Sequence, residues 1–167
     1  MINSVNSALE KLGYELNTED RRLADFFNEN GYCVIPKSDF LSENIPEYKQ
    51  IIDSLLEKES WRGGWEGKEE YMKYKKDFQP GANRLANLFN KNDLFLKLLT
   101  EKNILKIACA ILGDDIKVGA LDMREPKEGT GLQDLHIDWI PKKSEDEKTQ
   151  NIVAMCFLDD ADENNGH

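Results

Sequence analysis

Residues Leu132–Ile140 read LQDLHIDWI, in which apolar and polar side chains largely alternate. Side chains of a strand point alternately to the two faces of a sheet, so a period of two predicts a half-buried strand. Two more extended stretches lie in the same third of the chain, at Ile116–Met123 and at Asn151–Leu158. We therefore expect a sheet in the C-terminal third.

The segment ahead of these stretches contains a well-marked helix. Thr18 is a suitable N-cap, the acidic residues after it favour a first turn, and Gly31 is a typical C-terminal stop. Directly afterwards, Tyr32–Ile35 has the composition of a short strand that Pro36 ends. The pattern predicts a helix followed by a strand.

Two further helical regions follow along the chain. One starts near Ser42 or Asn44 and carries an apolar face, and the other covers Arg84–Leu112 in two segments separated near Thr100. Helices thus come first and strands last, which is the order of an α+β fold.

The length of 167 residues suits one domain with a sizeable core. We expect three parts: an arm over 1–17, a mainly helical layer over 18–113, and strands over 114–167. Residues 60–81 combine tryptophans, glycines and many charges, which suits either a mobile flap over a pocket or a surface loop pinned by its tryptophans. The charge run at 142–148, KKSEDEK, reads as a solvated loop.

The balance of charge argues against polyanionic partners. The formal net charge is −10 and the isoelectric point is near 4.8, whereas binding to nucleic acid or to an anionic membrane surface relies on lysine and arginine. The first residues show neither the basic nor the apolar region of a signal peptide, and we expect a cytoplasmic protein. Cys33, Cys109 and Cys156 are far apart in apolar sequence, which favours buried free thiols over disulfides.

His136 and Asp138 are the candidate metal ligands. In a strand the two side chains share a face, where an imidazole nitrogen and a carboxylate oxygen can occupy adjacent positions of one metal. With a second histidine they would form the 2-His-1-carboxylate set of non-haem iron, whereas zinc prefers a closed tetrahedral set for which this chain lacks clustered cysteines and histidines. Asp134 has the same parity and is either an acceptor for the imidazole N–H or a solvent-exposed residue at the strand entry.

Several blocks of sequence, in this order, resemble the phytanoyl-CoA dioxygenase family of Fe(II)- and 2-oxoglutarate-dependent oxygenases. The blocks are Leu23–Ile35 (LADFFNENGYCVI), Arg84–Leu88 (RLANL), Ile111–Gly113 (ILG), Leu135–Trp139 (LHIDW), Phe157–Asp160 (FLDD) and Glu163–Gly166 (ENNG). Each block alone is unspecific, but their order and spacing match the N-terminal half of that family, from about residue 20 onward.

The resemblance implies a fold, a chemistry and three site residues. The fold would be α+β, with N-terminal helices packed on a partial double-stranded β-helix of the jelly-roll, cupin-like kind, whose C-terminal strands are missing. His136 and Asp138 match the first two Fe(II) ligands, and Arg84 falls where the family places a basic residue near 2-oxoglutarate. A guanidinium suits a carboxylate, although a surface ion pair on a helix explains Arg84 equally well. The implied reaction is hydroxylation of a small organic substrate.

The chain also departs from the family pattern. The second iron histidine and the arginine that anchors the far carboxylate of 2-oxoglutarate have no counterpart, and His167 stands on the turn itself, so it is not assigned as a ligand. We expect a truncated protein that binds iron and cosubstrate weakly and self-associates through open sheet edges. Acyl-CoA is disfavoured as a substrate because its phosphates require a basic patch.

Two alternatives stay open at this stage. The chain is either a non-catalytic binding or scaffold remnant of the same fold, or an acidic α+β domain in which His136 is simply a core histidine.

Overall fold

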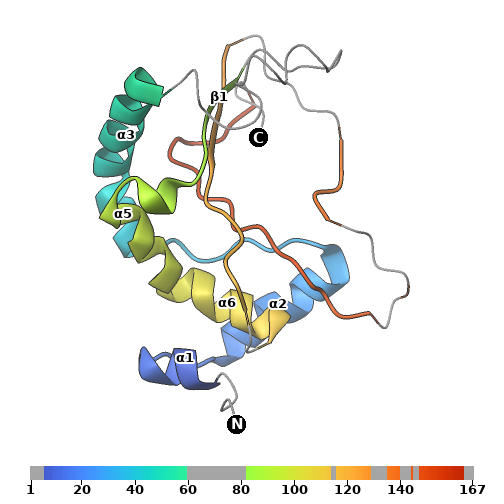
Figure 1. Cartoon of the computed structure of the whole chain (residues 1–167). Helices are drawn as coiled ribbons and strands as arrows, with labels where there is room; N and C mark the ends of the chain where they lie inside the picture. The colour runs from blue at the N-terminus through green and yellow to red at the C-terminus, as the bar shows by residue number, and fades with distance from the viewer. Residues whose placement is uncertain are drawn as a thin grey trace. The chain divides into compact units, whose positions relative to one another are not determined.

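The computed structural model describes residues 6–59, 82–113, 116–128, 135–139, 144 and 147–163 (Figure 1). It is a mixed α+β structure in which helices dominate and two short strands form an antiparallel sheet, so the expected class is confirmed. The elements are, in order, α1 (Asn6–Lys11), α2 (Thr18–Asn30), α3 (Asp39–Glu59), β1 (Ala82–Leu85), η3 (Leu88–Asn90), α5 (Asp93–Leu96), η4 (Lys97–Thr100), α6 (Lys102–Leu112) and β2 (Met123–Pro126).

The chain divides into two compact units. The first comprises Met1–Ile45, Lys97–Val118 and Asp138–His167, and the second comprises Pro46–Leu96 and Gly119–Ile137. One boundary falls inside α3, at Pro46. No helix of the described residues has both the length and the apolar character that a bilayer crossing requires.

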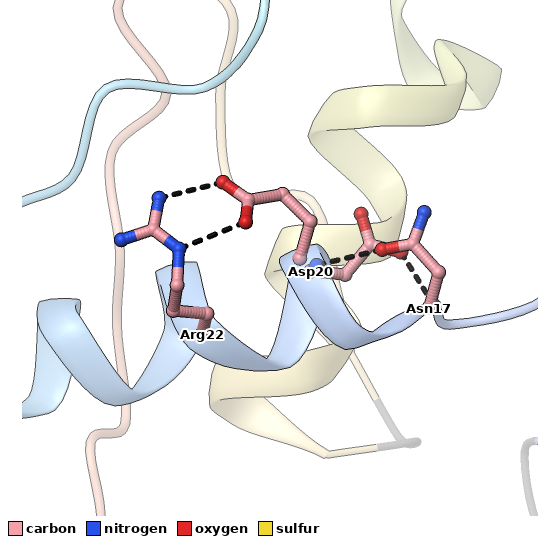
Figure 2. Close-up of polar contacts among 4 residues, drawn as sticks. Asn17, Asp20 and Arg22 are labelled. Atoms are coloured by element: carbon pink, nitrogen blue, oxygen red, sulfur yellow. Dashed lines mark hydrogen bonds and ion pairs between the residues drawn. The ribbon is translucent and has the colours of Figure 1, made fainter.

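In the first unit, α2 packs against α6, and their buried apolar residues include Leu23, Ala24, Ile107 and Cys109. Helix α2 begins with a reciprocal capping box, in which the Asp20 N–H donates to Asn17 Oδ1 at 2.9 Å and the Asn17 N–H donates to Asp20 Oδ2 at 2.8 Å (Figure 2). The N-cap is therefore Asn17 rather than Thr18, because only Asn17 has an acidic residue three positions later that returns the hydrogen bond. Gly31 ends the helix as expected, with a left-handed φ of 81°.

The second unit has its own core. Tyr48 and Ile52 of α3 are buried, as are Leu85, Leu88, Leu94 and Phe95. The Tyr48 hydroxyl donates to the Leu94 carbonyl at 3.1 Å, and the centroid of its ring lies 5.5 Å from the centroid of the Phe95 ring.

Helix α3 begins at Asp39, ahead of the expected Ser42 or Asn44, because Ser38 Oγ accepts a hydrogen bond from the Leu41 N–H.

The sheet of the second unit is a ribbon of two antiparallel strands. Its register pairs Ala82 with Pro126, Asn83 with Glu125, Arg84 with Arg124, and Leu85 with Met123. The ribbon extends one step further, because the Leu88 N–H donates to the Leu121 carbonyl at 2.9 Å and the Asn87 N–H donates to Asp122 Oδ1, also at 2.9 Å.

Several expected strands are wrong. Residues 32–35 and 151–158 form no strand, and of the expected strand at 116–123 only Met123 lies in β2. An alternating pattern marks a face that a sheet could bury, but a strand forms only where a second segment satisfies its backbone N–H and C=O groups. Arg84, expected at the start of a helical region, lies instead in β1 for this reason: β2 supplies its pairing partner.

Candidate functional site

The predicted metal ligands lie in an irregular segment. Residues 135–139 form no strand, and the chain bends at Asp138 and Trp139. His136 and Asp138 are both exposed, and so are their apolar neighbours, Ile137 at 72% and Trp139 at 51%. The alternation of apolar and polar residues at 135–139 therefore does not correspond to one buried face and one exposed face. Because His136 is exposed, it is not a core histidine.

Two observations bear on whether these residues form a metal centre. The boundary between the compact units falls between Ile137 and Asp138, so this division assigns the two predicted ligands to different units. In the part of the chain that the structure describes, no three histidine, cysteine or carboxylate side chains gather as a metal would require. Asp134 and His167 lie outside the described residues. A resident iron needs three protein ligands, so the described donor set does not by itself fit that group.

Arg84 lies on β1, half-buried, directly opposite Arg124 of β2. The same strands carry a polar contact on their other face, where Asn83 Nδ2 donates to Glu125 Oε2 at 2.7 Å. Sequence reasoning missed Arg124, because nothing local to residue 124 distinguishes it from an ordinary surface arginine. Only the pairing of strands 40 residues apart sets the two arginines opposite each other.

The buried polar residues of the described chain are explained by helix structure rather than by chemistry. They are Asp20, Ser38, Glu101 and Lys106. Asp20 closes the capping box of α2 and forms an ion pair with Lys106 of α6, while Glu101 caps α6 by accepting from the Ile104 N–H at 2.8 Å. Ser38 starts α3. Each of these side chains therefore satisfies a helix end or another charge.

The three cysteines are free, as expected, but only Cys109 is buried; Cys33 is half-buried and Cys156 is exposed. Burial raises the pKa of the Cys33 thiol. Although Cys156 as a residue is exposed, partial burial of its thiol and then the negative charge of Glu101 raise the pKa of that group as well. Neither thiol is activated as a nucleophile, because a reactive cysteine needs a lowered pKa.

The tryptophan-rich segment 60–81, with its two interpretations, lies outside the described residues, as does most of the charge run 142–148. Comparison of the chain with protein-family models, curated proteins and solved structures finds no match.

Proposed function

We propose that the chain belongs to a non-haem Fe(II)- and 2-oxoglutarate-dependent dioxygenase that hydroxylates a small organic substrate, of the phytanoyl-CoA dioxygenase kind. In this proposal His136 and Asp138 are two of the iron ligands, Arg84 contacts 2-oxoglutarate, and β1 and β2 are part of a larger jelly roll. The observation that carries the proposal is the His136-x-Asp138 pair within its ordered sequence blocks. Both side chains are exposed and so accessible to an ion from solution.

The proposal sets a limit on what these residues do. A histidine and an aspartate two positions apart supply two donors, so we expect weak, selective binding of a divalent ion rather than a tight site. The iron, when bound by a complete ligand set, supplies the oxygen chemistry. In this proposal His136 and Asp138 would bind the metal ion, and Arg84 would hold a carboxylate of 2-oxoglutarate through its guanidinium.

The test uses the chain's two histidines, His136 and His167, which give two imidazole Hε1 signals in a proton NMR spectrum. Small additions of paramagnetic Co(II) under nitrogen should broaden the His136 signal first. The variant His167→Ala assigns the signals and should leave the effect on His136 intact. Asp138→Asn should abolish the preference, whereas the matched change Asp159→Asn should not. If both signals broaden together, or the preference survives Asp138→Asn, the metal assignment fails.

A second candidate function is a non-catalytic binding or scaffold role for the same fold. It is favoured by Val153, Met155 and Phe157, which are 64%, 73% and 66% exposed and share a parity in one irregular segment. Neighbouring apolar side chains of this size in solvent are typical of an interaction surface. Multi-angle light scattering would favour this role if it finds one discrete oligomer whose mass is the same with Co(II) and with EDTA. A monomer, or a mass that changes with the metal, would speak against it.

A further inference from the structure

Helix α3 runs from one compact unit into the other and carries a proline in its interior. Pro46 lies about two turns past the first residue of the helix, at the boundary between the units. A proline has no backbone N–H to donate to the carbonyl four residues earlier, here that of Ser42, and its ring crowds that carbonyl. The residue before a proline, Ile45, is also disfavoured in a helical conformation. The helix is therefore weakened where it passes between the units.

The turn ahead of Pro46 contains two further contacts that bend helices. Ser42 Oγ donates to the Ser38 carbonyl at 2.8 Å, and Asn44 Nδ2 donates to the Phe40 carbonyl at 2.7 Å. Side-chain hydrogen bonds to a carbonyl four residues earlier compete with the backbone ladder and often bend the helix that contains them. The weakened part of α3 therefore covers the whole turn that ends at Pro46.

The two parts of α3 are anchored separately. The buried residues of the helix all follow Pro46, and Tyr48 among them donates to the Leu94 carbonyl in the second unit. The helix residues before Pro46 include no buried side chain. The chain that leads into them is held by the first unit, where Asn103 Nδ2 of α6 donates to the Pro36 carbonyl at 3.4 Å. A bend at Pro46 therefore breaks none of these anchoring contacts.

The other crossings between the units also suit backbone rotation. At Leu96–Lys97, α5 gives way to the 3-10 helix η4, which has no buried residue. At Gly119 an added Cβ would meet no atom within 4 Å, and at Asp138 the chain bends. Short 3-10 segments and the ends of elements are typical of hinges. The residues on both sides of each of these crossings are exposed, so rotation there displaces no packed side chain.

We propose that α3 is a hinge at Pro46, about which the two units move relative to each other, and that the other crossings follow as flexible connections. Sharp bends of helices occur mostly at prolines, and hinge movements take place at a few residues that absorb the change in backbone angles. The hinge involves neither His136 nor Arg84, so it stands independently of the proposed function.

The experiment measures distances between pairs of spin labels in the full chain by electron paramagnetic resonance. Labels attached to p-acetylphenylalanine leave the native cysteines untouched. The pair Glu43–Glu57 occupies exposed positions of α3 on the two sides of Pro46, and a straight helix would hold the two backbone positions about 21 Å apart. The parent should give a broad distance distribution, and Pro46→Ala, which restores the missing N–H, should narrow it. The control pair Glu47–Lys58 lies wholly after the proline and should give a narrow distribution in both proteins.

A third pair of labels reads the movement of the units themselves. Asp25 is an exposed residue of α2 in the first unit, and Glu57 belongs to the second. The distribution for this pair should be broader than that of the control pair in the parent and should narrow in Pro46→Ala. Alanine suits the interior of a helix better than proline does, so this variant should fold like the parent by circular dichroism.

Amide hydrogen exchange gives an independent measure of the same hinge. The N–H groups of the first turn after the proline, at Glu47 and Tyr48, should exchange about tenfold more slowly or less in Pro46→Ala, because the ladder before them is closed. Gln50→Ala is the matched control, since this exposed residue of the same helix already has an N–H, and it should leave these exchange rates unchanged. The hinge is wrong if the Glu43–Glu57 or Asp25–Glu57 distribution is as narrow in the parent as that of the control pair. It is equally wrong if Pro46→Ala alters neither the distributions nor the exchange.

Discussion

Replacing Lys106 by methionine removes one partner of a buried charge pair and tests the packing of the first unit. The Lys106 side chain is 5% exposed and that of Asp20 is 13% exposed, and the ammonium of α6 meets Oδ2 of α2. Removal of one partner from a buried pair costs about 3 to 5 kcal/mol, because the other charge stays buried without compensation. Methionine keeps the apolar stem, so the loss is mainly electrostatic.

The magnitude follows from what Asp20 retains. Its carboxylate still accepts from the Asn17 N–H at 2.8 Å and keeps some contact with water. We therefore expect the lower end of the range, about 3 kcal/mol. With a urea m-value of about 2 kcal/mol per molar, the midpoint should fall by about 1.5 M.

The assay is urea unfolding of the full chain followed by far-ultraviolet circular dichroism. Asp20→Asn combined with Lys106→Met should lose less than the two single changes added together, by about 1.5 kcal/mol or more, because the double variant buries no unpaired charge. The matched control is Arg22→Met, which breaks the exposed Glu19–Arg22 pair of the same helix and should leave the midpoint unchanged. Equal midpoints for Lys106→Met and Arg22→Met would refute the buried pair.

Two other predictions concern a helix end and a thiol. Gly31→Ala should lower the free energy of unfolding in urea by about 1 kcal/mol, because φ is 81° there and no neighbouring atom lies within 4 Å of the added Cβ, so only backbone strain acts. Gly119→Ala is the control, because an added Cβ meets no atom within 4 Å there either and the backbone lacks that φ, so it should change stability much less. Equal losses in the two variants would contradict the assignment of the effect to backbone strain. Alkylation of Cys156 by iodoacetamide should have its midpoint at a higher pH than alkylation of an ordinary thiol, because folding favours the neutral form and raises the pKa of this group. The associated stability is complete below the ordinary thiol pKa and is lost as pH rises from there through the raised pKa. Glu101→Gln keeps the acceptor that caps α6 and should lower the pH midpoint of Cys156 alkylation, while the midpoint of Cys33 stays unchanged as the reference. If the pH dependence of Cys156 alkylation is the same in Glu101→Gln, Glu101 does not contribute to the raised pKa.

Local signals in the sequence located the ends of α2 and α6 well, whereas α1 lies in the expected arm over 1–17. Gly31 and Gly113 end α2 and α6, and the break near Thr100 is where η4 ends and Glu101 caps the next helix. The start of α2 was misplaced by one residue because Asn17 and Thr18 are both good caps, and the choice depends on the hydrogen bond that Asp20 returns. Helix ends are predictable because their stabilising groups lie within one turn.

Strands and the candidate site were harder to predict, for a related physical reason. The alternation at 135–139 was genuine in the sequence, yet Ile137 and Trp139 are exposed and no strand forms there. Strand formation depends on a partner that can be far away in the chain, and a period of two records only that a face could be buried. The sequence blocks indicate Arg84 as a candidate residue but not the strand in which it lies, and they do not indicate Arg124. The two residues are related only through the β1–β2 register.

The same ribbon explains how two residues of like charge can be kept opposite each other in the fold. Leu85 is the neighbour of Arg84 on the opposite face and is 1% exposed, so the Leu85 end of that face is held in the core of the second unit. The hydrogen bond from Leu88 to Leu121 continues the pairing beyond the strands. Apolar burial and backbone pairing therefore fix the ribbon, and the register alone is sufficient to set Arg84 opposite Arg124.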